Sequence, residues 1–386
     1  MKIYDRNIIQ KQLEQIYTHN IYSTVPTYIE RKKISFTNKN KLKPIAFYLP
    51  QYYPTKINNQ NWGNGFTEWT NVAKAIPQYY GHYQPHIPEA FGYYDLRNVN
   101  IMEEQCNLAK EYGIFGFCFY YYYFQGKTQL EVPLINYVNN SNINFPFCLC
   151  WANENWTKKW DGKDQEILLQ QTYTKKDMEI FISKISKYFI LDNYIKINQR
   201  PLLIIYNAQG IPDLDDYIQL WREFCLHAGI GDIFLVCAKT FGLDDINIIN
   251  KFDACVEFPP HDIRLENKID YSLLTNKDFN GTIYHIYDYI TTMNNEINYP
   301  LFRCAFPSWD NTARTSARAK IFSDANPVTF EMWLKKIIRF TIELHTSEHR
   351  YFFINAWNEW GEGAHLEPDR KYGFAYLEKL RQCLEE

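Results

Sequence analysis

Short hydrophobic runs alternate with amphipathic segments along most of this chain. Eight runs are rich in β-branched and aromatic residues and are bounded by polar or turn-forming residues, a pattern typical of buried strands. The first follows Pro44 and the last ends at Asn355. The eight predicted strands span residues 45–49, 115–121, 145–151, 202–206, 233–238, 254–258, 302–306 and 351–355.

Between most of these runs, hydrophobic residues recur at helical spacing. The predicted helices span residues 99–112, 177–191, 213–228 and 329–345, and Gly113 ends the first of them. Continuous apolar strands that alternate with helices indicate a parallel sheet buried on both faces. Eight such strands predict an α/β fold, a single TIM-type (β/α)₈ barrel with long aromatic-rich loops after its strands. The alternative, a doubly wound open sheet, is disfavoured because no Gly-x-Gly-x-x-Gly follows an early strand.

The first 43 residues differ from the rest. A short amphipathic helix is predicted near Asn7–Tyr17, and basic stretches follow at residues 31–33 and 39–43. We therefore divide the chain into an N-terminal extension, residues 1–43, and a catalytic domain, residues 44–386. Solvation explains the basic charges most simply, and peripheral contact with an anionic membrane is the alternative.

Charge and cysteine usage narrow the class of protein. Lysine and arginine number 41 against 44 acidic residues, so no overall basic field attracts nucleic acid. No stretch is apolar enough to span a bilayer, and the first residues lack the apolar run of a secretory signal, so we expect a cytoplasmic protein. Six of the nine cysteines fall in strand-like runs, which predicts buried free thiols rather than disulfides or metal ligands.

Aromatic residues make up 17% of the chain, and many stand beside amides and acids at the ends of predicted strands. In a barrel of this type the chemistry lies at the carboxyl ends of the strands. Aromatic rings combined with polar groups suit a cleft that binds sugars. The candidate substrate-binding residues at these ends are Tyr52, Tyr121, Trp151, Asn153, Glu154, Trp156, Tyr206, Glu257, Trp309, Asp310, Trp357 and Asn358, and Trp62, Glu68 and Trp69 join them from a loop.

Two glutamates, Glu359 and Glu362, stand three residues apart after the last predicted strand. Glycosidic chemistry needs one acid to protonate the departing oxygen and a second carboxylate to act as base or nucleophile. Surrounding aromatic rings raise the pKa of a carboxyl group by desolvation. The alternative is a pair of acids that complements a helix dipole. The position of the pair among the other strand ends favours the catalytic interpretation.

Five motifs carry a family resemblance. They are PQYYP at residues 50–54, WGNGFTEW at 62–69, WANENW at 151–156, PSWDN at 307–311 and WNEWGEG at 357–363. In this order they resemble the WbsX family, described as glycosyltransferases of bacterial surface-polysaccharide clusters. That family is similar in fold and site to the endo-α-mannosidases among the glycoside hydrolases. The resemblance covers about residues 44–370.

The resemblance implies roles for the acids. Glu359 is implied as the base that deprotonates the sugar's own 2-hydroxyl, and Glu362 as the general acid, with a 1,2-anhydro intermediate and retention of configuration. Glu154 is implied to line the sugar site. No cofactor and no metal are expected, because the carboxylates perform the proton transfers. We expect an oligosaccharide or polysaccharide substrate, of lipopolysaccharide (O-antigen) or capsule type.

Three functions stay open on the sequence. The first is a glycoside-hydrolase-like enzyme that acts on a bacterial cell-surface polysaccharide. The second is a glycosyltransferase of surface-polysaccharide biosynthesis, although the sequence offers no convincing nucleotide-diphosphate site. The third is a glycan-binding protein without catalysis, which leaves the spacing of Glu359 and Glu362 unexplained.

Four further signals carry less weight. His345-x-x-Glu348-His349 fits a zinc-protease pattern, but it precedes the last strand and so belongs at the opposite end of the barrel. His82 and His86 are separated by Pro85, which disfavours a helical metal pair. The acids at residues 213–216 resemble the Asp-x-Asp pattern of metal-dependent sugar-nucleotide transferases, but they precede a helix and suit its N-terminus. Arg303 and Arg314 either meet an anionic group of the substrate or pair with acids.

Overall fold

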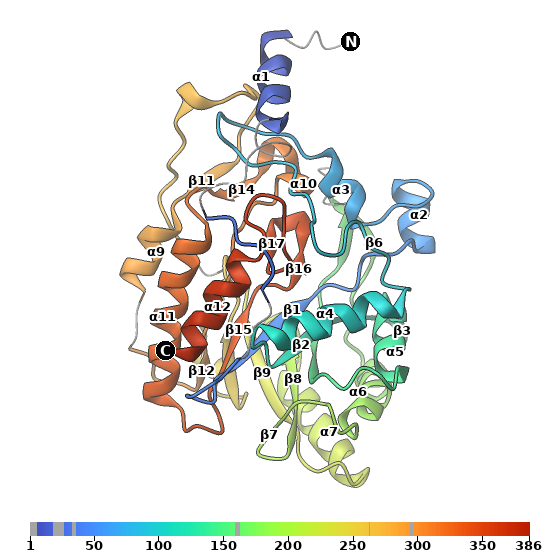
Figure 1. Ribbon diagram of the computed structural model, residues 1–386. Helices are drawn as coiled ribbons and strands as arrows, with labels where there is room; N and C mark the ends of the chain where they lie inside the picture. The colour runs from blue at the N-terminus through green and yellow to red at the C-terminus, as the bar shows by residue number, and fades with distance from the viewer. Residues whose placement is uncertain (1–5, 18–26, 33–35, 159–162, 262, 294–295) are drawn as a thin grey trace.

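The computed structural model of the protein describes residues 6–17, 27–32, 36–158, 163–261, 263–293 and 296–386. Nine parallel strand segments form a nearly closed barrel, in the order β12-β10-β9-β8-β4-β2-β1-β15-β13 (Figure 1). The predicted TIM-type barrel is thereby confirmed. The segments are β1 (Lys43–Tyr48), β2 (Gly116–Phe124), β4 (Phe147–Trp151), β8 (Arg200–Ile205), β9 (Phe234–Lys239), β10 (Ala254–Glu257), β12 (Leu301–Phe302), β13 (Cys304–Ala305) and β15 (Tyr351–Ile354).

The seventh predicted strand is divided at Arg303. β12 pairs with β10 on one side, and β13 pairs with β15 on the other, so this short stretch closes the ring. Arg303 forms an ion pair of 2.5 Å with Glu257 at the end of β10, and Glu257 also accepts a hydrogen bond from the backbone N–H of Cys304 at 3.1 Å. Both charged side chains are buried. Their pairing therefore ties β10 to β13 across the division.

Helices cover the outside of the barrel, as predicted (Figure 1). The sequence sets their starts: Thr174 and Asp177 form a capping box at the first turn of α6, and Asn326 accepts from the backbone at the start of α11. The larger helices are α4 (Val99–Glu111), α5 (Val132–Asn139), α6 (Lys175–Phe189), α7 (Leu214–His227), α11 (Pro327–Leu344) and α12 (Ala375–Glu385).

Aromatic rings fill much of the barrel interior. Phe47 of β1 packs against Tyr120, Phe258 and Phe353, with ring centroids 5.7, 4.8 and 5.5 Å apart. All nine cysteines are buried and free, which confirms the prediction made for them. The high aromatic content therefore serves packing as well as the site.

Short elements in the loops complete the fold. Those that follow the strand ends are α2 (Lys56–Trp62), α3 (Glu68–Lys74), β3 (Lys127–Gln129), β5 (Trp156–Lys158), β6 (Lys163–Leu169), α10 (Thr312–Thr315), β16 (Asn358–Glu359), η5 (Trp360–Glu362) and β17 (Ala364–His365). The others are β7 (Lys196–Ile197), α8 (Ile246–Ile249), η3 (Tyr271–Leu273), β11 (Thr282–Tyr284), α9 (Ile286–Thr292), η4 (Ser316–Arg318) and β14 (Lys320–Phe322).

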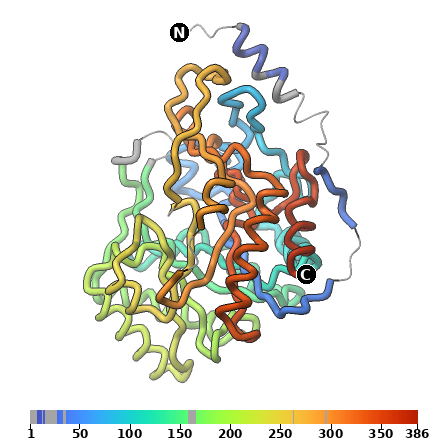
Figure 2. The backbone as a smooth tube through the Cα atoms, turned by 90° about the vertical axis from the view of Figure 1, so that its left-hand side faces the viewer, coloured from blue at the N-terminus to red at the C-terminus, as the bar shows by residue number. Residues whose placement is uncertain are grey.

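The N-terminal region begins with α1 (Arg6–Tyr17), which confirms the predicted helix and projects from the body of the molecule (Figure 2). Further along, Ile29 exchanges backbone hydrogen bonds with Tyr372 and Phe374, and Arg31 forms an ion pair of 2.7 Å with Glu111. The extension therefore packs in part on the barrel. Residue 33 of the first basic stretch lies outside the described residues, and contact with a membrane stays a prediction.

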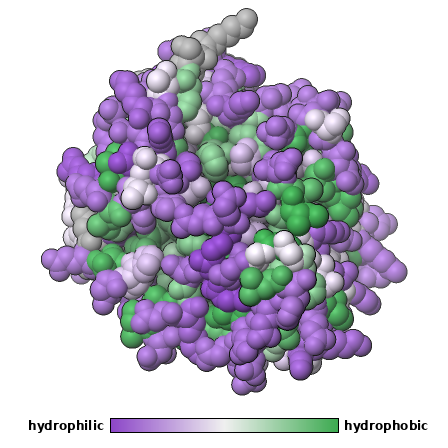
Figure 3. Space-filling model, turned by 90° about the horizontal axis from the view of Figure 1, so that it is seen from below, coloured by the Kyte–Doolittle hydropathy of each residue, from purple (hydrophilic) through white to green (hydrophobic). Residues whose placement is uncertain are grey.

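The face of the molecule opposite α1 is covered mainly by hydrophilic side chains, with hydrophobic groups scattered among them (Figure 3). Among the described residues, no helix combines the length and the apolar character that crossing a membrane requires.

Candidate active site

A cavity of about 720 Å³ lies at the carboxyl ends of the barrel strands. This volume is in the range of small-molecule sites, about 300–1,000 Å³. Its walls come from β2 itself and from loops after β1, β4, β8, β9, β10, β13 and β15, so segments far apart in the sequence meet there. Both glutamates of the predicted pair, Glu359 and Glu362, line it, and so does Glu154.

The glutamate pair sits on a hairpin made of β16, η5 and β17, in which Glu359 pairs with Ala364. The glycines of this motif are required by space and by backbone conformation. A Cβ atom on Gly361 would lie 1.9 Å from Oε1 of Glu68, and Gly363 has a φ of +60°. Tyr52 supports the turn from behind, because its hydroxyl donates to the carbonyl of Asn358 at 2.5 Å.

Arg314 of α10 holds three carboxylates at once. Its Nε lies 2.7 Å from Glu68, one terminal nitrogen lies 2.8 Å from Glu359, and the other lies 2.7 Å from Glu362. A guanidinium group suits this role, since its donors point in fixed directions in one plane. Three acids around one arginine leave excess negative charge in the site, which favours the retention of a proton.

Electrostatics place that proton on Glu359. Burial, together with the charges of Glu362 and Glu68, raises the pKa of Glu359 to about 8, although Arg314 opposes the shift. Burial by itself would lower the pKa of Arg314, but the three carboxylates raise it well above its usual value. A carboxyl group with a pKa near neutrality can accept and return a proton during a reaction cycle.

Aromatic rings form the walls around the acids. Trp62 and Trp156 are half-buried and line the cavity from two different loops. Trp156 packs edge-on against Tyr122, with ring centroids 5.2 Å apart. On the other side, the Tyr206 hydroxyl lies 3.1 Å from Nε2 of His261. Such a set of rings and polar groups suits the two faces of a sugar, one apolar and one rich in hydroxyls.

Seven of the predicted site residues line this cavity. They are Trp62, Asn153, Glu154, Trp156, Tyr206, Glu359 and Glu362. Whether they bind or transform a substrate stays a prediction.

Ten predicted site residues do not line it, and all ten are buried. Side chains of a strand alternate between its faces, so Tyr121 and Trp151 turn outward and pack on Phe181 of α6. Asp310 instead pairs with His82 at 2.5 Å and lines a second, smaller cavity. The ten residues are Tyr52, Glu68, Trp69, Tyr121, Trp151, Glu257, Trp309, Asp310, Trp357 and Asn358.

Several of these ten residues hold in place the residues that line the cavity. Glu68 holds Arg314. Asn358 accepts from the backbone N–H of Leu49 at 2.7 Å and donates to its carbonyl at 3.0 Å, which fixes the hairpin to the end of β1. Trp69 packs against Tyr52 and Trp360, with ring centroids 4.6 and 5.5 Å apart. Glu257 belongs to the barrel closure described above, and its ion pair with Arg303 accounts for its charge.

Several lining residues lie outside the set of candidate site residues. Tyr120 and Tyr122 flank Tyr121, and the alternation of side chains along a strand would have identified them once the inward face was known. Arg314 follows the PSWDN motif by only three residues, but nothing in the sequence reveals which acids it meets. The other lining residues outside the predicted set include Gln51, Asn155, Gln171, Tyr173, Asn207, Phe241, Phe258, His261, Asn311 and Thr315.

The zinc-protease pattern lies where it was expected. His345 is 3.3 Å from the carbonyl of Leu301, the first residue of β12, so it is at the amino end of the barrel strands. Asp213 precedes the first residue of α7, and Asp215 forms an ion pair of 2.5 Å with Lys251. Both patterns therefore lie outside the cavity. Arg303 and Arg314 both pair with acids, and because Arg314 also lines the cavity, its contact with an anionic group of the substrate stays a prediction.

Comparison with known proteins places these observations in a family. The sequence model described as Glycosyltransferase WbsX matches residues 44–380. The WxcX proteins of two Xanthomonas campestris pv. campestris strains, described as uncharacterized, are 40% identical over 342 residues, which are 88% of this chain and 49% of theirs. The chain thus spans about half the length of these curated relatives.

Solved structures share the fold. A glycoside hydrolase-like protein has a TM-score of 0.59 at 15% identity, with 93% of this chain and 98% of the other covered. The GH99 endo-alpha-mannosidase from Bacteroides thetaiotaomicron has a TM-score of 0.51 at 12% identity, with 90% and 96% covered. At such low identity these likenesses concern the barrel architecture.

Proposed function

The chain belongs to the WbsX glycosyltransferase family and is a carbohydrate-active enzyme, and we propose that it acts at a glycosidic bond of a bacterial cell-surface polysaccharide. The observation that carries this proposal is the carboxylate cluster in the cavity. Glu359 and Glu362 lie side by side on Arg314, between aromatic walls. This arrangement supplies the two proton-transferring groups that glycosidic chemistry requires.

The proposed reaction has two steps and retains configuration. In the first, the pair reacts with its shared proton on Glu362, and the ionised Glu359 takes the proton of the sugar's 2-hydroxyl, whose oxygen attacks C1. The bond from C1 to the leaving oxygen breaks with its electron pair, and that oxygen takes the proton of Glu362. In the second, water gives a proton to Glu362 and attacks C1. The bond between C1 and O2 opens, and O2 takes back its proton from Glu359.

A glycosyltransferase is the second candidate, and the family description favours it. The same two steps serve transfer when a hydroxyl of an acceptor sugar replaces water in the second step. The donor is then a glycan, whereas a conventional transferase uses a nucleotide sugar. The choice of donor therefore separates the two chemistries without any change in the roles of Glu359 and Glu362.

The proposal can be tested by incubating the protein separately with surface polysaccharide of its source and with nucleotide sugars. We expect new reducing ends, or glycan transferred to an added acceptor, only with the polysaccharide. Glu362→Gln should still bind the glycan but lose at least about 100-fold in rate, as for removal of a general acid. Glu348→Gln, which removes an exposed carboxylate at the opposite end of the barrel, is the matched control and should stay active.

Each outcome of this experiment has a meaning. Turnover of nucleotide sugars alone would favour the conventional transferase. Glycan binding without any reaction would support a binding protein and overturn the proposed chemistry. A first product of inverted configuration, or full activity on a substrate that lacks the 2-hydroxyl, would exclude the two-step mechanism. Neither result would contradict the assignment of Glu359 and Glu362 to the active site.

The pH profile tests the protonation state of the glutamate pair. The reactive form holds one proton on the pair, with Glu359 ionised and Glu362 protonated, so kcat/KM should fall once pH rises above about 8, where the pair loses that proton. A rate that keeps rising well above pH 8 would mean that the reaction needs no proton from the pair.

A further inference from the structure

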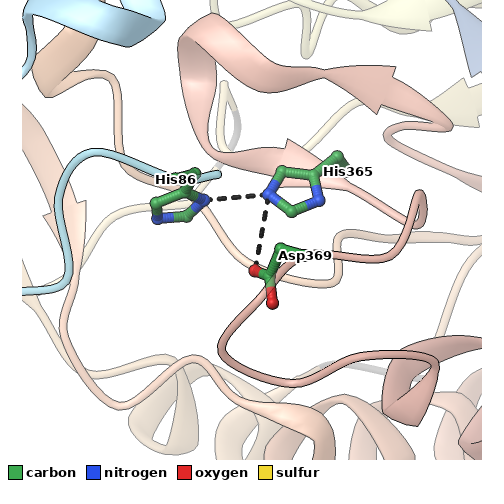
Figure 4. A group of neighbouring side chains, drawn as sticks. All are labelled: His86, His365 and Asp369. Carbon is green, nitrogen blue, oxygen red and sulfur yellow. Dashed lines mark hydrogen bonds and ion pairs between the residues drawn. The ribbon is translucent and has the colours of Figure 1, made fainter. Parts of the chain in front are cut away.

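Three buried side chains face one another next to the glutamate hairpin (Figure 4). Nδ1 of His86 lies 2.8 Å from Nε2 of His365, which in turn lies 3.9 Å from Oδ2 of Asp369. All three ligand atoms lie within 4.8 Å of one another. We propose that this cluster is a zinc site in which water supplies the fourth ligand. Two histidines and one carboxylate form a donor set typical of zinc.

The surroundings orient the ligand atoms of the cluster. Nδ1 of His365 lies 2.9 Å from the carbonyl oxygen of Glu367 and donates its proton to it, so the lone pair of Nε2 points into the cluster. The Oδ1 atom of Asp369 accepts the backbone N–H of Tyr372 at 2.7 Å, which leaves Oδ2 turned toward His365. A histidine held by a backbone carbonyl on its outer nitrogen is the usual support of a zinc ligand.

The backbone places the two ligand-bearing segments side by side. The N–H of Glu89 donates to the carbonyl of Pro368 at 2.9 Å, and the N–H of Arg370 donates to that of Ile87 at 3.0 Å. His365 also stacks on Trp360, with ring centroids 3.7 Å apart. The ligand atoms are therefore preorganised, which reduces the entropic cost of binding an ion.

A small cavity of about 70 Å³ borders His86 and Asp369. Tyr83 and Tyr376 also line it, and among the described residues their buried hydroxyl groups make no hydrogen bond of normal geometry. One water occupies roughly 30 Å³, so the cavity has room for a fourth ligand that these hydroxyls can bind.

Zinc requires the histidine rings to separate slightly and Oδ2 of Asp369 to approach Nε2 of His365 by about 0.6 Å from 3.9 Å. Tetrahedral bonds of about 2.0–2.1 Å hold two nitrogens roughly 3.3 Å apart, so the histidine rings must separate by about 0.5 Å from their present 2.8 Å. Without a metal, the same distance is that of a hydrogen bond between the two rings. This simple histidine pair is the alternative that an experiment must exclude.

The position of the site gives the metal a role. His365 pairs with Asn358 in the hairpin, and Asn358 precedes Glu359. His86 belongs to a different loop, which lies between α3 and α4. A zinc ion would therefore join that loop to the hairpin that carries the glutamate pair. The ion would stabilise the geometry of the active site without contact with the substrate.

The test uses protein purified without a histidine tag and freed of metal with a chelator. Zinc is titrated in competition with a chromophoric chelator, and cobalt is added separately to observe its visible absorption bands. We expect one equivalent of zinc to bind with a Kd tighter than about 10 µM, a cobalt spectrum of low coordination number and a higher Tm with zinc. Asp369→Asn and His86→Gln should each weaken zinc binding at least about tenfold.

Matched controls keep the test decisive. His349→Gln removes a histidine at the other end of the barrel, where it contacts Asn198 before β8, and should leave zinc binding unchanged. Asp369→Asn keeps the acceptor for Tyr372, so it carries the test if His86→Gln does not fold. Absence of stoichiometric zinc binding by the parent, or equal binding by both cluster variants, would show that the cluster is only a hydrogen-bonded pair.

Discussion

Glu359 is a single residue whose environment determines its chemistry. An exposed glutamate ionises near pH 4.5, but burial beside Glu362 and Glu68 raises the pKa of Glu359 to about 8. Arg314 limits this effect, because it is shared among the three carboxylates. The site therefore maintains a reactive carboxyl group at the expense of the stability of the fold, a trade that is common at active sites.

This trade gives a prediction for Glu359→Gln. Between pH 4.5 and about 8 the folded protein holds a proton that the unfolded chain releases, so the free energy of unfolding decreases as pH rises through this window. Glutamine cannot ionise and removes the decrease. In thermal unfolding followed by circular dichroism, Glu359→Gln should match the parent near pH 5 and exceed its Tm by several degrees near pH 9.

The control is Glu348→Gln, whose Tm difference from the parent should not change with pH in this way. A constant difference between Glu359→Gln and the parent from pH 5 to pH 9 would mean that Glu359 ionises normally.

At the scale of elements, η5 packs closely against α3 and α10. The space between them holds no side chain at Gly361. A Cβ atom there would lie 1.9 Å from Oε1 of Glu68 and 2.8 Å from Nε of Arg314. Gly361→Ala should therefore displace Glu68 and Arg314, lower stability by about 1–3 kcal/mol and reduce activity.

A double-mutant cycle checks the cause of this effect. Once Glu68→Ala removes the obstructing side chain, Gly361→Ala should cost clearly less stability than it does in the parent. Equal costs in both backgrounds, measured by denaturant unfolding, would assign the effect to the backbone of η5 instead.

The end of β4 supplies a second prediction, because two nearby tryptophans have opposite environments. Trp151 is 2% exposed and stacks on Phe181, whereas Trp156 lines the cavity. Trp151→Ala should lower stability by about 3–5 kcal/mol through the void it creates. Trp156→Ala should weaken glycan binding by roughly fivefold, as expected for a stacking ring worth about 1 kcal/mol, with little change in Tm.

Calorimetric titration and thermal unfolding of both variants would decide between these environments. A large fall in the Tm of Trp156→Ala with unchanged affinity would place Trp156 in the core.

For the whole molecule, the closure of the barrel depends on the buried pair of Glu257 and Arg303. Glu257→Gln removes the negative charge and leaves the buried Arg303 guanidinium without the carboxylate that it pairs with at 2.5 Å. We expect a loss of about 3–5 kcal/mol in the free energy of unfolding. Since neither residue lines the cavity, kcat of the folded fraction should stay near that of the parent. A loss of activity with unchanged stability would show that Glu257 acts in the substrate site.

The sequence by itself determined the barrel. Continuous apolar runs can be buried only in a sheet covered on both faces, and the helical spacing between the runs supplies the cover. The same local patterns located the helix at Asn7–Tyr17, the buried cysteines and the acid pair at the end of the last strand. These features depend on neighbours in sequence, so periodicity and motif chemistry were enough to predict them.

Only the tertiary structure decided which strand-end residues face the cavity. A step of one residue turns a strand side chain from the interior to the helices, which separates Tyr122 from Tyr121. The contacts of Arg314 with Glu68, Glu359 and Glu362 join segments that are far apart in sequence. The meeting of His86 with His365 and Asp369 has the same origin. Such contacts arise from the closure of the barrel and the course of its loops, and no local pattern encodes them.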